Sequence, residues 1–187
     1  MLRRITDEIT RCLDNECYIA ALSLALTIPD ACGKAEYPTA SVTERYIKWY
    51  NENMGQYEKS DDPNRPDDVK MPYMSGEVLY NLRNSFLHQG TPSIDANKIK
   101  DERCKVDSFI LTVDNAMSGG SSTVSYGMNN QIEHRALEIN IVNLCVKLVA
   151  VARGYYKENA DKFDFFQYTL RDNREVHERF RRLQNAD

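Results

Sequence analysis

Residues 137–159, LEINIVNLCVKLVAVARGYYKEN, decide the fold class, because they carry the clearest helical pattern in the chain. Apolar side chains recur there every three or four residues, a spacing that places them on one face of an α-helix. They are Leu137, Ile141, Leu144, Leu148, Val151 and Tyr155. A helix with one apolar stripe buries that stripe against other elements. The stretch therefore predicts a core helix over about 138–158.

The same spacing predicts four further helices, over residues 2–28, 41–54, 75–89 and 165–184. Pro29 is expected to stop the first of them. Ser75 is a favourable N-cap for the third, and Gly90 is expected to end it. Four or five helices of this length, joined mostly by short links, predict an antiparallel bundle. The expected fold class is therefore mainly α.

Two segments interrupt the helical pattern. Residues of about 55–74 hold three prolines, five acids and little to bury, which predicts a long exposed loop. Residues of about 105–137 change to a strand-like period, with β-branched residues before a turn at 118–121 and alternation after it. This second segment predicts a small β-hairpin insertion, and residues 135–138 fit a third short strand.

Composition is consistent with a single soluble domain over residues 1–187. The chain has 187 residues, of which 42% are hydrophobic, and a formal net charge of −4. An acidic protein is not a general nucleic-acid coat, because phosphate binding depends on Lys and Arg. The apolar run 18–28 is too short to span a bilayer, and the five cysteines form no Cys-x-x-Cys pair. We therefore expect a cytoplasmic protein with reduced thiols and no membrane association.

Arg83, Asn84 and His88 form the strongest candidate site, near the end of the third helix. Asn84 and His88 are four residues apart, which makes them neighbours on a helix surface. A guanidinium offers planar donors matched to phosphate oxygens, and an imidazole moves protons near neutral pH. The three side chains suit chemistry on a phosphodiester. An Arg and a His also occur on many helices by chance, so a structural role remains the alternative.

The stretch 82–90, LRNSFLHQG, resembles the signature of the HEPN superfamily, the higher eukaryotes and prokaryotes nucleotide-binding domains. Ribonuclease members carry Arg, often followed by Asn, and then His after a gap of four to six residues. The motif stands late in a bundle helix, as predicted here. The hairpin at 105–137 and the acidic loop before the motif depart from the family's minimal pattern.

The resemblance implies a metal-independent endoribonuclease in a toxin–antitoxin or phage-defence setting. His88 would be the general acid and base, Arg83 would bind the phosphate, and Asn84 would position them. RNA would be the substrate, and the family commonly pairs two motifs across a homodimer; an antitoxin protein is a further expected partner. The alternative is a non-catalytic HEPN-like module that binds nucleotides, nucleic acid or another protein.

The sequence predicts neither a metal nor a cofactor. His134 and His177 lack the spacing of metal ligands, and Gly33-Lys34 lacks the other residues of a phosphate-binding loop. Five arginines of the segment 165–184 alternate with acids, which is typical of a solvated, ion-paired helix face. An RNA-guiding patch is the less favoured interpretation of these arginines.

Overall fold

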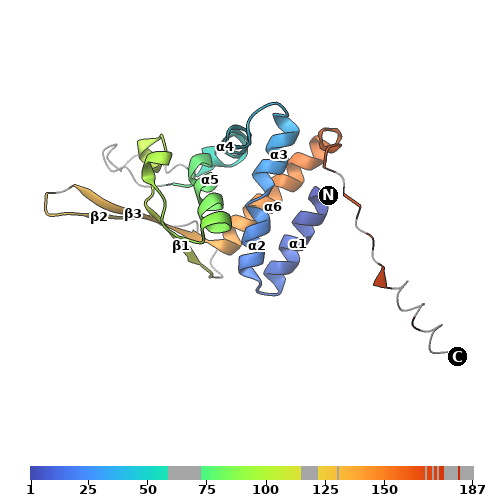
Figure 1. Cartoon of the computed structure of the whole chain (residues 1–187), viewed down its shortest axis with the longest axis horizontal. Coiled ribbons are helices and arrows are strands. Elements are labelled where there is room, and N and C mark those ends of the chain that lie inside the picture. The colour runs from blue at the N-terminus through green and yellow to red at the C-terminus, as the bar shows by residue number, and fades with distance from the viewer. Residues whose placement is uncertain are drawn as a thin grey trace.

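The computed structural model describes residues 1–58, 73–114, 122–129 and 131–166, together with residues 168, 169, 171, 173, 174 and 181. The chain is mostly helical and carries a small three-stranded sheet. In Figure 1 the helices gather on one side of the molecule and the sheet projects from the other side. The expectation of a mainly α protein with a small β element is confirmed.

The α-helices of the described residues are α1 Leu2–Asp14, α2 Tyr18–Ala25, α3 Ile28–Glu36, α4 Val42–Asn53, α5 Gly76–Asn84 and α6 Ile141–Glu158. α6 packs against α1, α2 and α3, and α4 packs against α3 and α5 (Figure 1). The largest fully buried side chain is Trp49 of α4, and Leu148 of α6 is also fully buried. α6 is therefore the core helix that its apolar stripe predicts.

The single helix predicted over 2–28 is wrong, because the chain breaks twice in this stretch. After α1, Asn15 donates its side-chain amide to the Arg11 carbonyl at 2.8 Å, and Glu16 adopts a left-handed φ of 57°. The chain then folds back as α2 against α1 (Figure 1). Pro29 stands in the first turn of α3, where a missing N–H costs no helical hydrogen bond, so it begins a helix rather than ending one.

The second predicted helix is confirmed within one residue at each end. Ser41 caps α4 by accepting a hydrogen bond from the Glu44 N–H at 3.3 Å. The short 3₁₀ turn Gly55–Tyr57 follows it. Most of the predicted loop at 55–74 lies outside the described residues.

The sheet contains β1 Ser108–Thr112, β2 Ser122–Tyr126 and β3 Ile132–Asn140, in the spatial order β1-β3-β2. β3 pairs in parallel with β1 and antiparallel with β2. The predicted hairpin, which joined the first two strands, is therefore wrong: the hairpin is β2–β3, and the third strand is long and central. The turn predicted at 118–121 lies outside the described residues.

β3 runs directly into α6, and Asn140 is the junction. Its side chain accepts from the Asn143 N–H at 3.1 Å, which caps α6, and donates to Asp114 Oδ1 at 2.7 Å. The core helix predicted from residue 138 therefore starts at Ile141. Leu137 and Ile139 are buried from the strand instead, because residues two apart share one face of a sheet.

The last predicted helix, at 165–184, falls mostly outside the described residues. Phe165 and Phe166 are not helical, whereas Arg174 and Arg181 are. Within the part of the chain that is described, no helix has both the length and the apolar character needed to cross a bilayer.

Candidate functional site

The start of α5 fixes the helix that carries the candidate site. Ser75 accepts a hydrogen bond from the Val78 N–H at 3.3 Å, as its role of N-cap predicts. The Gly76 N–H donates to Asn51 Oδ1 at 2.7 Å, and a Cβ at Gly76 would lie 2.5 Å from the Ile47 carbonyl oxygen. This close approach requires glycine. α5 is thereby seated directly on α4.

The end of this helix is not α-helical. Ser85–Gln89 form a π-helical turn, η2, in which the Gly90 N–H donates to the Ser85 carbonyl at 2.8 Å. Gly90 then ends the helix with a left-handed φ of 64°, as predicted. A π turn rotates by fewer degrees per residue than an α-helix does. The angle between Arg83 and His88 about the helix axis is therefore smaller than the roughly 140° expected in a regular α-helix. Such π turns are frequent at functional sites.

Arg83 is half-buried and faces its own helix and α4. Its Nη1 donates to the side-chain oxygen of Asn84 at 3.0 Å, and its guanidinium carbon lies 5.9 Å from the centre of the Tyr80 ring. Its Nε is buried and has no hydrogen-bond partner among the described residues. Leaving a buried donor unpaired costs about 1–3 kcal/mol. The guanidinium is therefore held in place by Asn84 and Tyr80, and its Nε–H remains unpaired among the described residues.

Tyr80 is the residue of this site that the sequence reasoning missed. Its hydroxyl accepts a hydrogen bond from Thr43 at 2.8 Å, and its ring meets the Tyr46 ring edge-on at 5.2 Å. Burial raises the pKa of Tyr46, while the nearby Arg83 charge acts in the opposite direction. The three-residue spacing from Tyr80 to Arg83 could have identified the pair, because such residues are neighbours on a helix.

His88 lies at the exposed end of the π turn. Two residues before it Phe86 is partly buried against the core, and Ser85 is buried and donates to the Leu82 carbonyl at 3.1 Å. Within the described part of the chain, no hydrogen bond joins His88 to Arg83 or Asn84. The structure thus brings Arg83 and Asn84 into contact, and it leaves the imidazole open to solvent on the same helix end.

This arrangement can bind an anion and exchange a proton. Arg83 is a permanent cation, and Asn84 restrains it. His88 is exposed, and histidine is the side chain most often used as a general acid or base. Among the described residues, no group of three or more His, Cys, Asp or Glu side chains could hold a metal ion. The side chains of Arg83, Asn84 and His88 themselves offer electrostatic and acid–base chemistry at this helix end.

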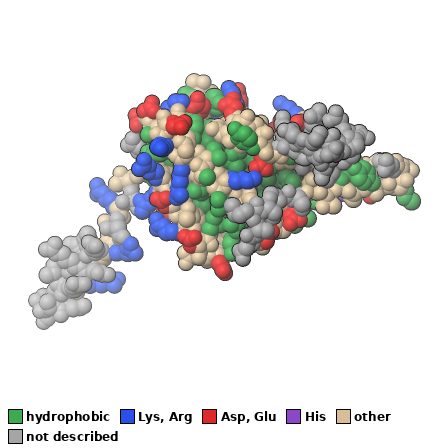
Figure 2. Space-filling view, turned by 180° about the vertical axis from the view of Figure 1, so that it is seen from behind, with side chains coloured by type: hydrophobic (Ala, Val, Ile, Leu, Met, Phe, Trp, Pro, Cys, Tyr) green, Lys and Arg blue, Asp and Glu red, His purple; other side chains and the backbone are tan. Residues whose placement is uncertain are grey.

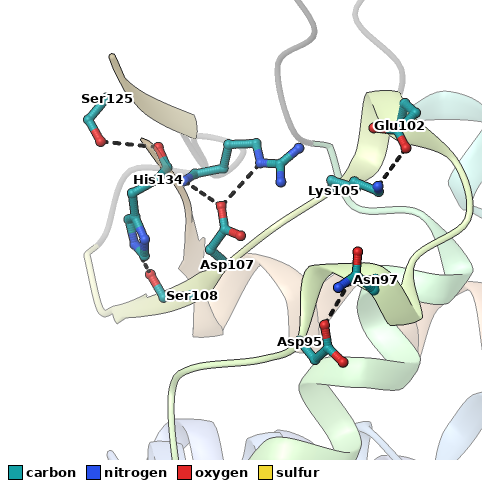
Figure 3. Close-up of polar contacts among 9 residues, drawn as sticks. Asp95, Asn97, Glu102, Lys105, Asp107, Ser108, Ser125 and His134 are labelled. Atoms are coloured by element: carbon teal, nitrogen blue, oxygen red, sulfur yellow. Dashed lines mark hydrogen bonds and ion pairs between the residues drawn. The ribbon is translucent and has the colours of Figure 1, made fainter. Parts of the chain in front are cut away.

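A serine–histidine contact occurs at a second place, on the sheet. Ser108 Oγ lies 2.8 Å from His134 Nε2, and the neighbouring Asp107 carboxylate accepts from Arg135 instead (Figure 3). A nucleophilic dyad needs a third group to orient its base. In Figure 3 the His134 imidazole points to Ser108, and the hydrogen bonds drawn to the Asp107 carboxylate come from Arg135 rather than from the imidazole. His134 is thus a hydrogen-bonded surface residue, and His177 lies outside the described residues.

No family model, curated protein or solved structure matches the chain.

Proposed function

We propose that this protein is a metal-independent endoribonuclease of HEPN type, built on a HEPN-like helical bundle. The observation that carries the proposal is the end of α5, where Arg83, Asn84 and an exposed His88 share one π-turn terminus. The Arg-Asn-x-x-x-His spacing, and its place at the end of a helix closed by Gly90, support the family resemblance. The packing of α6 on α1, α2 and α3 supports a bundle.

The roles follow from the chemistry of each side chain. His88 takes the proton from the ribose 2′-hydroxyl or gives one to the leaving oxygen. Arg83 stabilises the negative charge that develops on the phosphate. Asn84, which accepts from Arg83 Nη1 at 3.0 Å, positions the guanidinium.

A homodimer would complete the site. One chain supplies one imidazole and one guanidinium, and a two-fold axis beside the ends of two α5 helices would double both. Isologous pairing of this kind is the commonest oligomer symmetry. We place such a dimer in a toxin–antitoxin or phage-defence setting, in which an antitoxin protein would cover the motif.

The test is cleavage of a panel of single-stranded and hairpin RNAs in the presence of EDTA. Wild-type protein is expected to cleave, and His88→Ala is expected to lose roughly 10²–10⁴ of the rate, as expected for a missing general acid–base. Arg83→Ala should lose activity similarly, and Arg83→Lys should recover part of it, because an ammonium cannot reproduce the bidentate fork. His134→Ala is the matched control, since it removes another exposed histidine and should leave cleavage unchanged.

A specific observation favours the second candidate, a non-catalytic HEPN-like binding or interaction module. Arg83 already packs over Tyr80 and bonds Asn84, contacts that would serve a purely structural role. If no RNA of the panel is cut, and if Arg83→Ala lowers the melting temperature while His88→Ala does not, the ribonuclease proposal is wrong and this module takes its place.

A further inference from the structure

A basic cavity lies between the start of α1 and the end of α6, at the other end of α6 from the sheet. Its volume is about 170 Å³, and it is lined by Arg3, Thr6, Asp7, Arg153, Tyr156 and Lys157. Figure 2 shows Lys and Arg side chains gathering over this end of the molecule. An overall acidic chain thus carries a local concentration of positive charge.

The cationic side chains of this cavity differ in whether they form an ion pair with a described residue. Arg153 is held in place, because its Nη2 lies 2.8 Å from Asp7 Oδ1 and its Nε donates to Thr6 Oγ1 at 3.3 Å. Arg3 and Lys157 form no ion pair with any residue that the structure describes. The guanidinium carbon of Arg3 instead lies 5.3 Å from the centre of the Tyr156 ring. Two cations therefore remain available to an anion beside an aromatic ring.

A row of aromatic rings begins at Tyr156, which lines the cavity. Tyr156 meets Phe163 at 5.1 Å, and Phe163, Phe165 and Phe166 follow at centre-to-centre distances of 6.2 and 5.9 Å with nearly parallel planes. Tyr168 closes the row at 6.4 Å from Phe166. Phe165 is 47% exposed and Tyr168 is 76% exposed. These outer rings are therefore accessible to solvent rather than filling the core.

We propose that this surface, formed by Arg3, Lys157, Tyr156, Phe165 and Tyr168 and called here the α1/α6 surface, binds single-stranded nucleic acid. Backbone phosphates contact Arg3 and Lys157, and bases stack on the exposed rings. Single-strand binding sites combine these two elements, a positive groove and stacking aromatic side chains. The α1/α6 surface contains neither Arg83 nor His88, so the inference goes beyond the proposed ribonuclease and does not depend on it.

The test is fluorescence anisotropy with a labelled single-stranded RNA of about 12 nucleotides, a length within the usual range of such sites. The strand carries 2′-O-methyl groups, so that cleavage cannot interfere. Arg3→Glu/Lys157→Glu is expected to weaken binding at least tenfold at low salt and to flatten the dependence of affinity on salt. The matched control is Arg11→Glu/Lys98→Glu, which changes the net charge equally at exposed positions outside the cavity.

A second pair of variants tests stacking separately from charge. Tyr168→Ala should weaken binding at least fivefold and leave the salt dependence unchanged, because stacking on one ring contributes without displacing ions. Tyr57→Ala is the control, since Tyr57 is 78% exposed on the short turn after α4, outside the α1/α6 surface.

Three results would overturn the proposal. The first is equal affinity of the Arg3/Lys157 and Arg11/Lys98 variants for the single strand. The second is binding of a duplex of the same length as tightly as the single strand, which would indicate a general polyanion surface. The third is binding to phosphatidylserine vesicles without binding to the oligonucleotide, which would assign the surface to a membrane. Circular dichroism of each variant verifies that it is folded.

Discussion

Asp107 shows how one carboxylate can fix the register of a small sheet. Its Oδ2 accepts from the backbone N–H of Arg135 at 2.8 Å and from the side-chain Nε of the same residue at 3.1 Å (Figure 3). Burial opposes ionisation of this carboxyl, but the hydrogen bonds from Arg135 outweigh burial and hold its pKa below the usual value. The parallel pairing of β1 with β3 starts immediately after Asp107 and Arg135.

This lowered pKa predicts an acid-dependent loss of stability. A carboxyl whose pKa is lower in the folded state stabilises the protein above its unfolded pKa of about 3.9, and this contribution is lost as the pH falls through the folded pKa. Asp107→Asn should cost roughly 1–2 kcal/mol at neutral pH, because the negative charge that strengthens both hydrogen bonds from Arg135 is lost. Its free energy of unfolding should also change less than that of wild type between about pH 5 and pH 3.

Urea unfolding at a series of pH values measures both effects. Asp161→Asn is the control, because Asp161 is an exposed carboxylate and forms no ion pair with the described residues. If the free energies of unfolding of wild type and Asp107→Asn change in parallel with pH, the carboxylate has no such role.

At the level of the element, α5 depends on its contact with α4. Gly76 allows the backbones to approach, and Ser75 and Asn51 satisfy N–H groups of the first turn that have no helical partner. The opposite end of the same helix carries Arg83 and His88. A displacement of the helix start would therefore be transmitted to the candidate site.

Two glycine substitutions separate packing from helix propensity. Gly76→Ala should destabilise the protein by roughly 1–3 kcal/mol, because the added Cβ would meet the Ile47 carbonyl oxygen at 2.5 Å. Gly154→Ala should instead stabilise it by about 0.5–1 kcal/mol, because Gly154 lies inside α6 and a Cβ there meets nothing within 4 Å. Thermal and urea unfolding provide the comparison, and a shift of the same sign in both variants would contradict this account of α5.

At the scale of the whole molecule, the candidate site lies next to the junction of helices and sheet. Pro92, four residues after His88, accepts a hydrogen bond from the Phe109 N–H of β1 at 2.9 Å. The α1/α6 surface lies at the far end of the core helix (Figures 1 and 2). The molecule thus separates its proposed catalytic groups from its proposed strand-binding surface.

The proposed ribonuclease predicts a defined assembly. Light scattering at micromolar concentration should give twice the 21.6 kDa mass of one chain, because one chain provides a single Arg83 and His88. A bulky substitution at the exposed Gln89, such as Gln89→Trp, should weaken the dimer and RNA cleavage together if the two helix ends meet at the axis. A monomer that still cleaves RNA would disprove the paired site, and a stable dimer unaffected by Gln89→Trp would place the interface elsewhere.

The sequence by itself determined the features that depend on neighbouring residues. The apolar stripe of α6, the cap Ser75 and the termination at Gly90 are local signals, and the structure confirms them. The presence of Arg83, Asn84 and His88 on one helix end follows from the same signals. Helix periodicity, capping and left-handed glycine act over a few residues, so a single sequence contains them.

Only the tertiary structure decided which segments meet. β1 pairs with β3 rather than with β2, although the intervening turn residues favoured the first two strands, because strand pairing is set by burial across the sheet. The sequence did not reveal the break at Glu16, because the helical spacing of apolar residues continues from α1 through α2. The edge-on contact of the Tyr80 ring with Tyr46 of α4, and the meeting of α1 with α6 around a basic cavity, likewise depend on packing. Such contacts join residues distant in the chain, and local periodicity carries no information on their partners.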